Sequence, residues 1–174
     1  MDNDLMFSTG NDEWETPQEL FNRLNKLYNF TIDVCATHEN AKCKRYYTKS
    51  EDGLIQDWSN EIVWMNPPYS KPERVCKPNC KKKACVKRGY HLKEYKPGQE
   101  DWIKKAYEES QKGALVVALL PVRTDTQAFH KYIYKKQDID FLEGRLKFGN
   151  CKDAAPFPSM IVVFKKILLR NNSK

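Results

Sequence analysis

The sequence predicts an α/β fold built on a mostly parallel, doubly wound sheet. Short apolar segments alternate with segments whose apolar residues recur at helical spacing, which is the pattern of strands joined by helices. The seven-residue run at 114–120, rich in Val and Leu, is typical of a parallel strand covered on both faces. A chain of 174 residues is long enough for one such core, so we expect a single domain over residues 1–174.

Local signals place the expected elements along the chain. Thr16-Pro17-Gln18-Glu19 is a capping box with proline at the first helical position, and apolar residues of one helical face follow it. A second helix is expected at 101–112, where Gly113 provides a stop, and a third at 127–135. The strands expected in order are 30–34, 62–65, 114–120, 139–142 and 160–164.

The positive charge is concentrated in one segment. The formal net charge is +7, and residues 71–96 alone carry ten Lys and Arg against Glu73 and Glu94, which leaves the rest close to neutral. This distribution indicates a polyanionic partner, although a solvated charged loop would give the same pattern. No run approaches the roughly 18 apolar residues of a membrane span and no amino-terminal hydrophobic region indicates export, so we expect a cytoplasmic protein without a membrane partner.

The same segment holds a cysteine cluster of metal-ligand type. Six cysteines without an export signal indicate reduced thiols or metal ligands rather than a disulfide framework. Cys76-x3-Cys80-x4-Cys85-x5-His91 offers three thiolates and an imidazole, the donor set of a tetrahedral zinc site, and metal binding would order a stretch poor in apolar residues. The insert at 71–97 is therefore a candidate zinc knuckle. The alternative is a lysine-rich loop with inert thiols, and Cys151 is the substitute ligand to test if His91 is not the fourth.

Asn66-Pro67-Pro68-Tyr69 is the candidate catalytic motif, and it directly follows the apolar run at 62–65. A strand ending in this way resembles the loop with which several methyltransferases present a flat, amino-bearing substrate to S-adenosylmethionine (SAM). The Asn66 amide oxygen and the Pro67 carbonyl can accept hydrogen bonds from an exocyclic amine and stabilise the positive charge that builds during methyl transfer. The prolines fix the turn, and Tyr69 offers a face on which a base can stack. The alternative is an ordinary Asn-Pro turn.

Seven segments in order resemble the phage-type DNA N6-adenine methyltransferase (Dam) family, and together they span roughly residues 12–165. The segments are Trp14-Glu15-Thr16-Pro17, Phe30-Thr31-Ile32-Asp33-Val34-Cys35-Ala36, Asp52-Gly53-Leu54 with Trp58, Trp64-Met65-Asn66-Pro67-Pro68-Tyr69, Leu120-Pro121-Val122-Arg123-Thr124-Asp125-Thr126, Gly144-Arg145-Leu146-Lys147-Phe148 and Ala155-Pro156-Phe157-Pro158-Ser159.

This resemblance implies a SAM-dependent methyltransferase of Rossmann-like fold that methylates adenine N6 in double-stranded DNA. The residues it implies for SAM binding are Trp14, Thr16, Pro17, Asp33, Cys35, Ala36 and Asn66. The sequence departs from the family pattern at 35–38, where Cys-Ala-Thr-His stands in place of the usual F-x-G-x-G. Two alternatives stay open. Thr16 is equally suited to capping the helix, and Asp33 could cap the next turn, although the resemblance favours its role in SAM binding.

Candidate DNA contacts fall into two groups. The basic residues of the insert would contact phosphates, which adds affinity but carries no sequence information; they are Lys81, Lys82, Lys83, Lys87 and Arg88. Arg123, Thr124, Asp125 and Thr126 follow the strand at 114–120 and are candidate base readers, while Arg145 and Lys147 could face phosphate. The alternative role of Asp125 or Thr126 is to cap the following helix. Phe148 or Phe157 could wall the pocket that receives the adenine, which must be extruded from the duplex.

Other functions share the same motif. Enzymes that methylate a glutamine side-chain amide in proteins, and enzymes that methylate adenine in RNA, use the same catalytic loop. A third class is a catalytically silent zinc- and DNA-binding relic of a methyltransferase. The basic insert disfavours a protein substrate, and the resemblance favours DNA over RNA. It also favours a phage- or prophage-encoded enzyme of DNA modification, of the kind found in restriction-modification, that acts in the bacterial cytoplasm. The recognition sequence and oligomeric state are left open.

Overall fold

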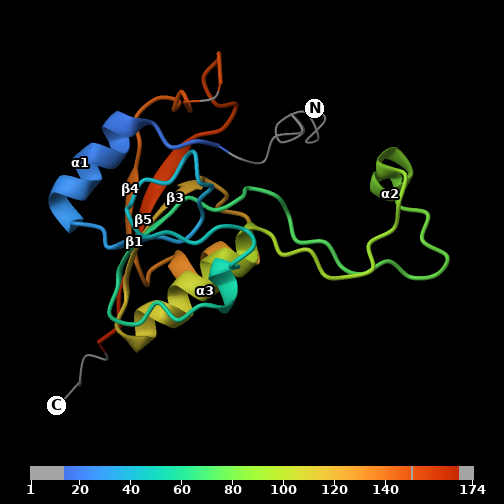
Figure 1. The fold of residues 1–174 in the computed structure, drawn as a ribbon, viewed down its shortest axis with the longest axis horizontal. Coiled ribbons are helices and arrows are strands. Elements are labelled where there is room, and N and C mark those ends of the chain that lie inside the picture. The colour runs from blue at the N-terminus through green and yellow to red at the C-terminus, as the bar shows by residue number, and fades with distance from the viewer. Residues whose placement is uncertain (1–13, 150, 169–174) are drawn as a thin grey trace.

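A five-stranded sheet in the order β1-β2-β3-β5-β4 forms the centre of the computed structural model, which describes residues 14–149 and 151–168 (Figure 1). The strands are β1 (Ile32–Asp33), β2 (Ile62–Met65), β3 (Leu115–Pro121), β4 (Asp138–Phe141) and β5 (Ser159–Phe164). β1, β2 and β3 run parallel, whereas β5 runs antiparallel to both β3 and β4. The predicted α/β class is confirmed, and the sheet is mixed.

The prediction of a mostly parallel sheet is wrong for its second half. Parallel neighbours need a crossover connection, which is usually a helix. α3 (Gln99–Lys112) provides that crossover between β2 and β3. Residues 142–158, which join β4 to β5, contain no helix in their described part, so β5 returns in the opposite direction and inserts between β3 and β4.

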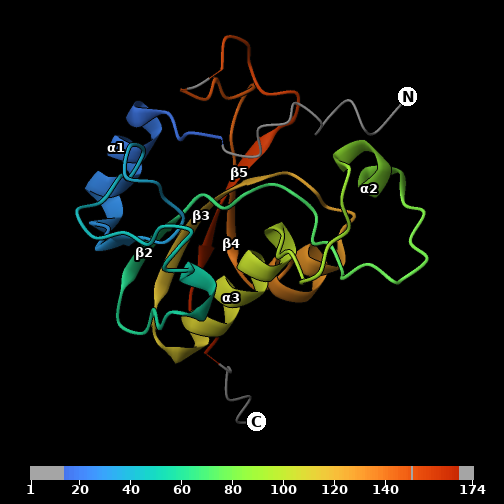
Figure 2. The same cartoon turned by 45° about the vertical axis from the view of Figure 1, so that its right-hand side comes forward.

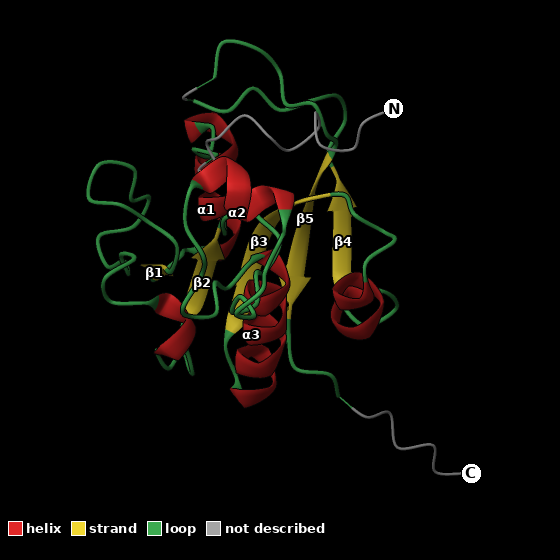
Figure 3. Ribbon diagram, turned by 90° about the vertical axis from the view of Figure 1, so that its right-hand side faces the viewer, coloured by secondary structure: helices red, strands yellow, loops and turns green. Residues whose placement is uncertain are grey.

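Helices cover both faces of the sheet, as a doubly wound arrangement requires. α1 (Gln18–Tyr28) lies on one side and α3 on the other (Figures 1 and 3). Side chains alternate along a strand, so Val117 and Leu119 of β3 belong to the core cluster of α1, whereas Val116 and Leu120 belong to that of α3. Two short helices complete the fold, the 3-10 helix η1 (Gly53–Ile55) and the π-helix η2 (Phe129–Ile133).

Several elements differ in length from the sequence prediction. The strand expected at 30–34 is reduced to β1, and the N–H of Phe30 donates to the Asn25 side chain at 2.9 Å instead of to a neighbouring strand. The helix expected at 127–135 is represented by the short η2. α3 begins two residues before the expected start, since the Gly98 N–H donates to the Asp101 carboxylate at 2.8 Å, and it ends at Gly113 as predicted.

Residues 71–97, called the arm from here on, project from the body of the protein and carry α2 (Lys83–Arg88) (Figures 1 and 2). The arm is attached through a neck, residues 70–73 and 96–99. Glu73 and Lys96 pair there through two main-chain hydrogen bonds of 2.9 Å. A Cβ on Gly98 would lie 2.3 Å from the Pro72 nitrogen, so the close approach of the two neck segments requires glycine.

Among the helices in the described part of the chain, none combines the length and the apolar character that crossing a membrane demands.

Candidate active site and metal cluster

A cavity of about 540 Å³ opens where β1 and β2 end. Its wall combines the segment before α1, the loop after β1, the segment that begins η1, the loop after β2 and the neck of the arm. The principal lining residues are Trp14, Thr16, Asp33, Cys35, Ala36, Lys42, Asp52, Gly53, Asn66, Pro67, Pro68, Ser70, Lys96, Pro97 and Trp102. The structure thus brings together most of the residues predicted for the catalytic loop and for SAM.

The Asn66 amide is held in one orientation at this wall. Its nitrogen donates to the main-chain carbonyl of Trp14 at 2.5 Å and to the Thr16 hydroxyl at 3.0 Å. Because a carbonyl can only accept, the amide nitrogen must face Trp14. The amide oxygen accepts from the Tyr69 hydroxyl at 2.9 Å, and an amide oxygen has a second lone pair with which it can accept a substrate amine.

Tyr69 acts from behind the cavity. Its side chain is only 3% exposed, and its hydroxyl also approaches the carbonyl of Leu119 at 3.3 Å. Burial raises the pKa of Tyr69, so the hydroxyl keeps its proton and stays a donor to Asn66. The sequence interpretation expected an open ring face for a base. In this structure the ring is part of the core and that face is covered.

Two phenylalanines predicted as pocket walls lie in the same buried cluster. Phe148 and Phe157 are each 1% exposed and meet the Tyr69 ring at centroid distances of 6.3 and 5.5 Å. The Trp14 ring packs on both, at 5.1 and 5.2 Å. These side chains support Trp14 and Tyr69 from behind and do not line the cavity.

Thr16 serves Asn66 and does not cap α1. The helix begins after Pro17, and no side chain caps its first turn. The capping-box interpretation is therefore wrong, and Pro17 lies one position before the predicted place. Thr16 is 4% exposed, and its hydroxyl accepts from the Asn66 amide nitrogen, which is the contact a cavity residue would make. Pro17 itself is not part of the cavity lining.

Asp33 organises the loop after β1. One carboxylate oxygen accepts from the Cys35 N–H and the other from the Lys42 N–H, both at 3.1 Å. The alternative role of Asp33 as a turn cap is thus confirmed, and the same carboxylate lines the cavity. Burial raises the pKa of Asp33, and burial together with the Asp33 charge raises that of Cys35, which therefore remains a neutral thiol. Ala36, next along the loop, is 8% exposed at the cavity wall.

Asp52, Gly53 and Trp102 line the cavity although the sequence interpretation gave them no site role. Asp52 has φ of 50° and its side chain accepts from the Leu54 N–H at 3.1 Å. A Cβ on Gly53 would lie 2.5 Å from the Val34 carbonyl oxygen, which holds this turn against the end of β1. The Asp-Gly turn signal was present in the sequence, but its contact with β1 is a tertiary feature.

The candidate base readers after β3 make local contacts. Arg123 donates from Nη2 to the Tyr69 carbonyl at 2.9 Å, so it braces the catalytic loop. The Thr126 hydroxyl accepts from the Phe129 N–H at 3.2 Å and donates to the Arg123 carbonyl at 3.1 Å, as its alternative role as a cap predicts. Thr124 is exposed, and so are Arg145 and Lys147 in the loop that carries Phe148 towards Trp14.

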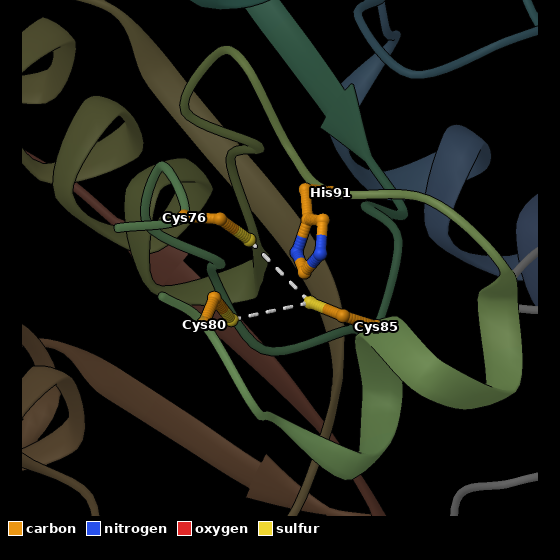
Figure 4. Close-up of side chains that lie close together, drawn as sticks. All are labelled: Cys76, Cys80, Cys85 and His91. Carbon is orange, nitrogen blue, oxygen red and sulfur yellow. Dashed lines mark hydrogen bonds between the residues drawn. The ribbon is translucent and has the colours of Figure 1, made fainter. Parts of the chain in front are cut away.

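The four predicted metal ligands come together in the arm (Figure 4). The ligand atoms of Cys76, Cys80, Cys85 and His91 lie within 4.8 Å of one another. The Cys85 sulfur is 3.4 Å from that of Cys76 and 3.7 Å from that of Cys80. A zinc–sulfur bond of about 2.3 Å in a tetrahedron separates two sulfurs by about 3.8 Å, so the cluster fits zinc. Cys151 packs in the α1 core cluster and is not a member of this group.

Hydrogen bonds to the sulfurs support a metal-binding role. The Leu92 N–H donates to the Cys76 sulfur at 3.3 Å, and Arg88 Nη2 donates to the Cys85 sulfur at 3.4 Å. The Lys82 N–H lowers the pKa of Cys80 to about 7, whereas the hydrogen bond with Cys76 raises that of Cys85. Such contacts around a metal site orient the ligands.

The five arm residues predicted to grip DNA fall into two classes. The four lysines Lys81, Lys82, Lys83 and Lys87 are exposed. Arg88 is different, because its side chain is only 18% exposed and Nη1 contacts both carboxylate oxygens of Glu73 at 3.2 and 3.0 Å. The guanidinium is therefore held inside the arm, and the prediction of Arg88 as a phosphate contact is not supported by its position.

The position of the cavity indicates the general class of the protein. A cavity at the carboxyl ends of parallel strands, beside an oriented amide, is typical of α/β enzymes that bind a small molecule at the edge of their sheet. The family follows from sequence comparison. The model of the family described as DNA N-6-adenine-methyltransferase (Dam) matches residues 6–171, so the chain belongs to this family of DNA adenine methyltransferases. Membership implies a Rossmann-like fold and SAM as the methyl source.

Individual relatives match a shorter stretch. The chain is 40% identical over 63 residues to the DNA N-6-adenine-methyltransferase of Haemophilus phage HP1 (strain HP1c1), which covers 35% of this chain and 36% of that protein. It is 38% identical over 64 residues to the protein of the same name from Escherichia phage T1, covering 36% of this chain and 27% of that protein. The chain thus spans about a third of the length of these curated relatives.

Proposed function

We propose that the chain transfers a methyl group from SAM to N6 of adenine in double-stranded DNA, using Asn66-Pro67-Pro68-Tyr69 as its catalytic loop. The observation that carries this proposal is the Asn66 amide, which three hydrogen bonds fix at the wall of the cavity. A pre-oriented acceptor is what methylation of an aromatic amine needs, because the lone pair of that nitrogen is delocalised into the ring.

The residues of the loop act on the substrate amine. Asn66 Oδ1 and the Pro67 carbonyl each accept a hydrogen bond from the N6 amino group. These bonds draw the nitrogen towards tetrahedral geometry. SAM, when bound, supplies a methyl group on a sulfonium sulfur. The nitrogen–carbon bond forms as the carbon–sulfur bond breaks, S-adenosylhomocysteine leaves, and one N6 proton passes to water. Tyr69 keeps its proton throughout and holds the Asn66 amide in place.

The cavity suits SAM in size and in chemistry. Its volume of about 540 Å³ lies within the roughly 300–1,000 Å³ range of small-molecule sites. Thr16 and the loop from Asp33 through Cys35 and Ala36 are the residues that would hold SAM. Asp33 and Asp52 provide carboxylates that can meet the cationic and hydroxyl groups of the cofactor.

The exposed lysines of the arm are the proposed contacts to the DNA backbone. Lys81 and Lys82 directly precede α2, and Lys83 and Lys87 belong to that helix. Phosphate contacts of this kind position the duplex without reading its sequence. The target adenine is extruded from the stack to reach Asn66. Thr124, Arg145 and Lys147 are the exposed residues that remain as further DNA contacts.

We further propose one structural zinc ion at Cys76, Cys80, Cys85 and His91. The support is the tetrahedral spacing of the sulfurs and the scarcity of buried residues in the arm, where α2 buries Cys85 alone. Elemental analysis of purified protein should give one zinc per chain, and Cys80→Ser should lose it. Cobalt substitution should give the visible absorption of a tetrahedral thiolate site. A metal-free protein whose thiols all react at once with a thiol reagent would refute the site.

Asn66→Ala tests the catalytic assignment. We expect the methyl-transfer step to fall by about 10²-fold or more, because one oriented polar stabiliser is deleted, while SAM affinity is largely kept. Asn22→Ala is the matched control, since Asn22 lies on the exposed face of α1 and contacts Gln18. Near-normal turnover in the Asn66 variant would contradict the assignment of this motif as the catalytic loop.

The substrate decides among the alternatives. Methyl label found in RNA or in a protein glutamine, with none in DNA, would show that DNA is not the substrate. The proposed chemistry of the catalytic loop would still hold. Absence of SAM binding would leave a silent zinc- and DNA-binding relic. The phage relatives support a phage- or prophage-encoded enzyme that acts in the bacterial cytoplasm.

A further inference from the structure

The arm is connected to the cavity by a short series of contacts. Arg88 joins two parts of the arm, because Nη2 donates to the Cys85 sulfur at 3.4 Å while Nη1 contacts both oxygens of the Glu73 carboxylate. Glu73 lies in the neck, where its main chain pairs with that of Lys96. Lys96 lines the cavity, and its ammonium lies 3.7 Å from the Glu73 carboxylate. Three contacts therefore lead from a metal ligand to the cavity wall.

The two segments of the neck are joined closely enough that a displacement of one would also displace the other. Glu73 and Lys96 exchange two main-chain hydrogen bonds of 2.9 Å, and the Gln99 N–H donates to the Ser70 carbonyl at 2.8 Å. Gly98 lies against the Ser70–Pro72 backbone so closely that a Cβ would clash. Ser70 and Lys96, one on each side of the neck, both face the cavity. A change in the neck therefore moves part of the cavity wall.

Arg88 is suited to this role by its position and chemistry. Its side chain is 18% exposed, and that of Glu73 is 29% exposed, so the pair is partly shielded from water. The guanidinium also lies over the Tyr90 ring, 4.9 Å from its centroid. A planar guanidinium can meet a carboxylate and a thiolate at the same time, whereas a lysine ammonium cannot hold both with fixed geometry.

We propose that Arg88 is a positioning residue that links metal occupancy of the arm to the wall of the SAM cavity. A metal at the cysteine cluster fixes Cys85, Cys85 orients Arg88, and Arg88 holds Glu73 and the neck in the closed pairing that places Lys96 and Ser70 at the cavity. The inference rests on the proposed zinc site and the proposed SAM site. It also gives the arm a second role besides contact with DNA.

Amide hydrogen exchange of the neck tests the link without reference to activity. In Arg88→Gln and in protein stripped of metal, the amides of Glu73, Lys96 and Gln99 should exchange faster than in the zinc-loaded wild type. Glu73→Gln breaks the same pair, together with the 3.7 Å ion pair between Glu73 and Lys96, without touching the cysteine cluster. It should therefore keep one zinc and lose at least as much protection as Arg88→Gln. Lys87→Gln removes one positive charge from the adjacent position of α2 and should leave neck protection unchanged.

The second readout is SAM affinity measured by calorimetry in the absence of DNA. Arg88→Gln and Glu73→Gln should each weaken SAM binding roughly threefold to tenfold, and the double variant should be no weaker than Glu73→Gln alone, because Glu73→Gln already breaks the contact with Arg88. Lys87→Gln should bind SAM as the wild type does.

Unchanged neck protection in Glu73→Gln, or in metal-free protein, would overturn the link. If Arg88→Gln alone lost its zinc, the Glu73→Gln result would still decide the matter. A wild-type protein that binds no SAM would refute the proposed function, but the exchange measurements would still test the coupling of metal to neck.

Discussion

Asn66 is held by Trp14 and Thr16, which are distant from it in sequence, and by Tyr69 three residues later, and the orientation of its amide depends on all three. The hydroxyls of Thr16 and Tyr69 contact opposite ends of one amide, and both side chains are nearly buried. Hydrogen bonds between buried groups fix orientation, because the alternative is an unsatisfied polar atom. At the scale of single residues, the account therefore predicts that these two hydroxyls matter for the chemical step and contribute little to binding.

Tyr69→Phe should lower kcat by about tenfold, since it removes one orienting hydrogen bond and keeps the ring in its aromatic cluster. KM for SAM and for DNA should change little. Single-turnover methylation rates would measure the effect, and Tyr28→Phe on α1 serves as the control. An unaltered rate would show that the Tyr69 hydroxyl is not needed to orient Asn66.

Thr16→Val should lower the chemical rate by roughly threefold to tenfold, because the isosteric side chain cannot accept from the Asn66 amide nitrogen. Thr16→Ser retains a hydroxyl at the same position and should keep most of the activity. The comparison uses the same rate measurement for both variants. If Val and Ser behaved alike, the contribution of Thr16 would be its shape and not its hydrogen bond.

At the scale of elements, α3 is fixed to the segment before β2 by one buried carboxylate. Glu109 is 0% exposed, and it accepts from the Trp58 N–H at 2.9 Å, from Lys105 at 2.7 Å and from Lys112 at 2.8 Å. Burial by itself would raise the pKa of Glu109, but these lysines and the Trp58 N–H outweigh it and lower the pKa below its usual 4.5. A buried carboxylate with three partners is costly to neutralise.

Glu109→Gln should reduce the free energy of unfolding by about 2–3 kcal/mol at pH 7, because two lysines lose their partner. Since folding lowers the Glu109 pKa, the wild type has this contribution above pH 4.5 and loses it as the pH falls through the lower folded value. The difference between wild type and variant in urea unfolding should therefore shrink below pH 4.

Glu108→Gln is the matched control on the same helix. Glu108 is half exposed and pairs with Lys104 at 3.7 Å, so its loss should cost less than about 1 kcal/mol at any pH. Equal effects of the Glu108 and Glu109 variants would contradict the assignment of Glu109 as the anchor of α3.

The sequence located the elements that depend on local pattern. The run at 62–65 predicted β2 and thereby the position of Asn66, and the cysteine spacing predicted the cluster of the arm. What the sequence could not show are contacts between distant segments. Tyr69 is buried because Phe148 and Phe157, some 80 residues later, close over it. The direction of β5 depends on a helix-free connection, which strand patterns do not encode.

For Arg88 the difference is one of environment. In a segment rich in Lys and Arg, the sequence predicts phosphate contact equally for every basic residue. The fold separates them, because Arg88 meets Glu73 and the lysines beside it stay exposed. In the same way Thr16 had the correct type for a helix cap, but a contact to Asn66 fifty residues away determines its role.

At the scale of the whole molecule, the charge distribution is the basis of the proposal that the arm contacts DNA. Replacing Lys82, Lys83 and Lys87 by Gln should weaken binding to all sequences alike. The slope of log K against log salt should become shallower by about 2–3 units, since each phosphate contact contributes roughly 0.9. Fluorescence anisotropy with labelled duplexes over a range of salt concentrations would measure this.

The control removes the same charge from the body of the protein. Lys26, Lys104 and Lys131 are exposed and lie outside the arm. Their replacement by Gln should leave the salt slope nearly unchanged. Equal changes in the two triple variants would mean that net charge, and not the arm, governs binding.

Incubation of the purified protein with methyl-labelled SAM and unmethylated phage or bacterial DNA, followed by digestion to nucleosides, tests the central claim most directly. The account predicts label in N6-methyldeoxyadenosine for the wild type and at least about 10²-fold less for Asn66→Ala. A wild-type protein that binds SAM and the duplex but leaves no label in deoxyadenosine would contradict it.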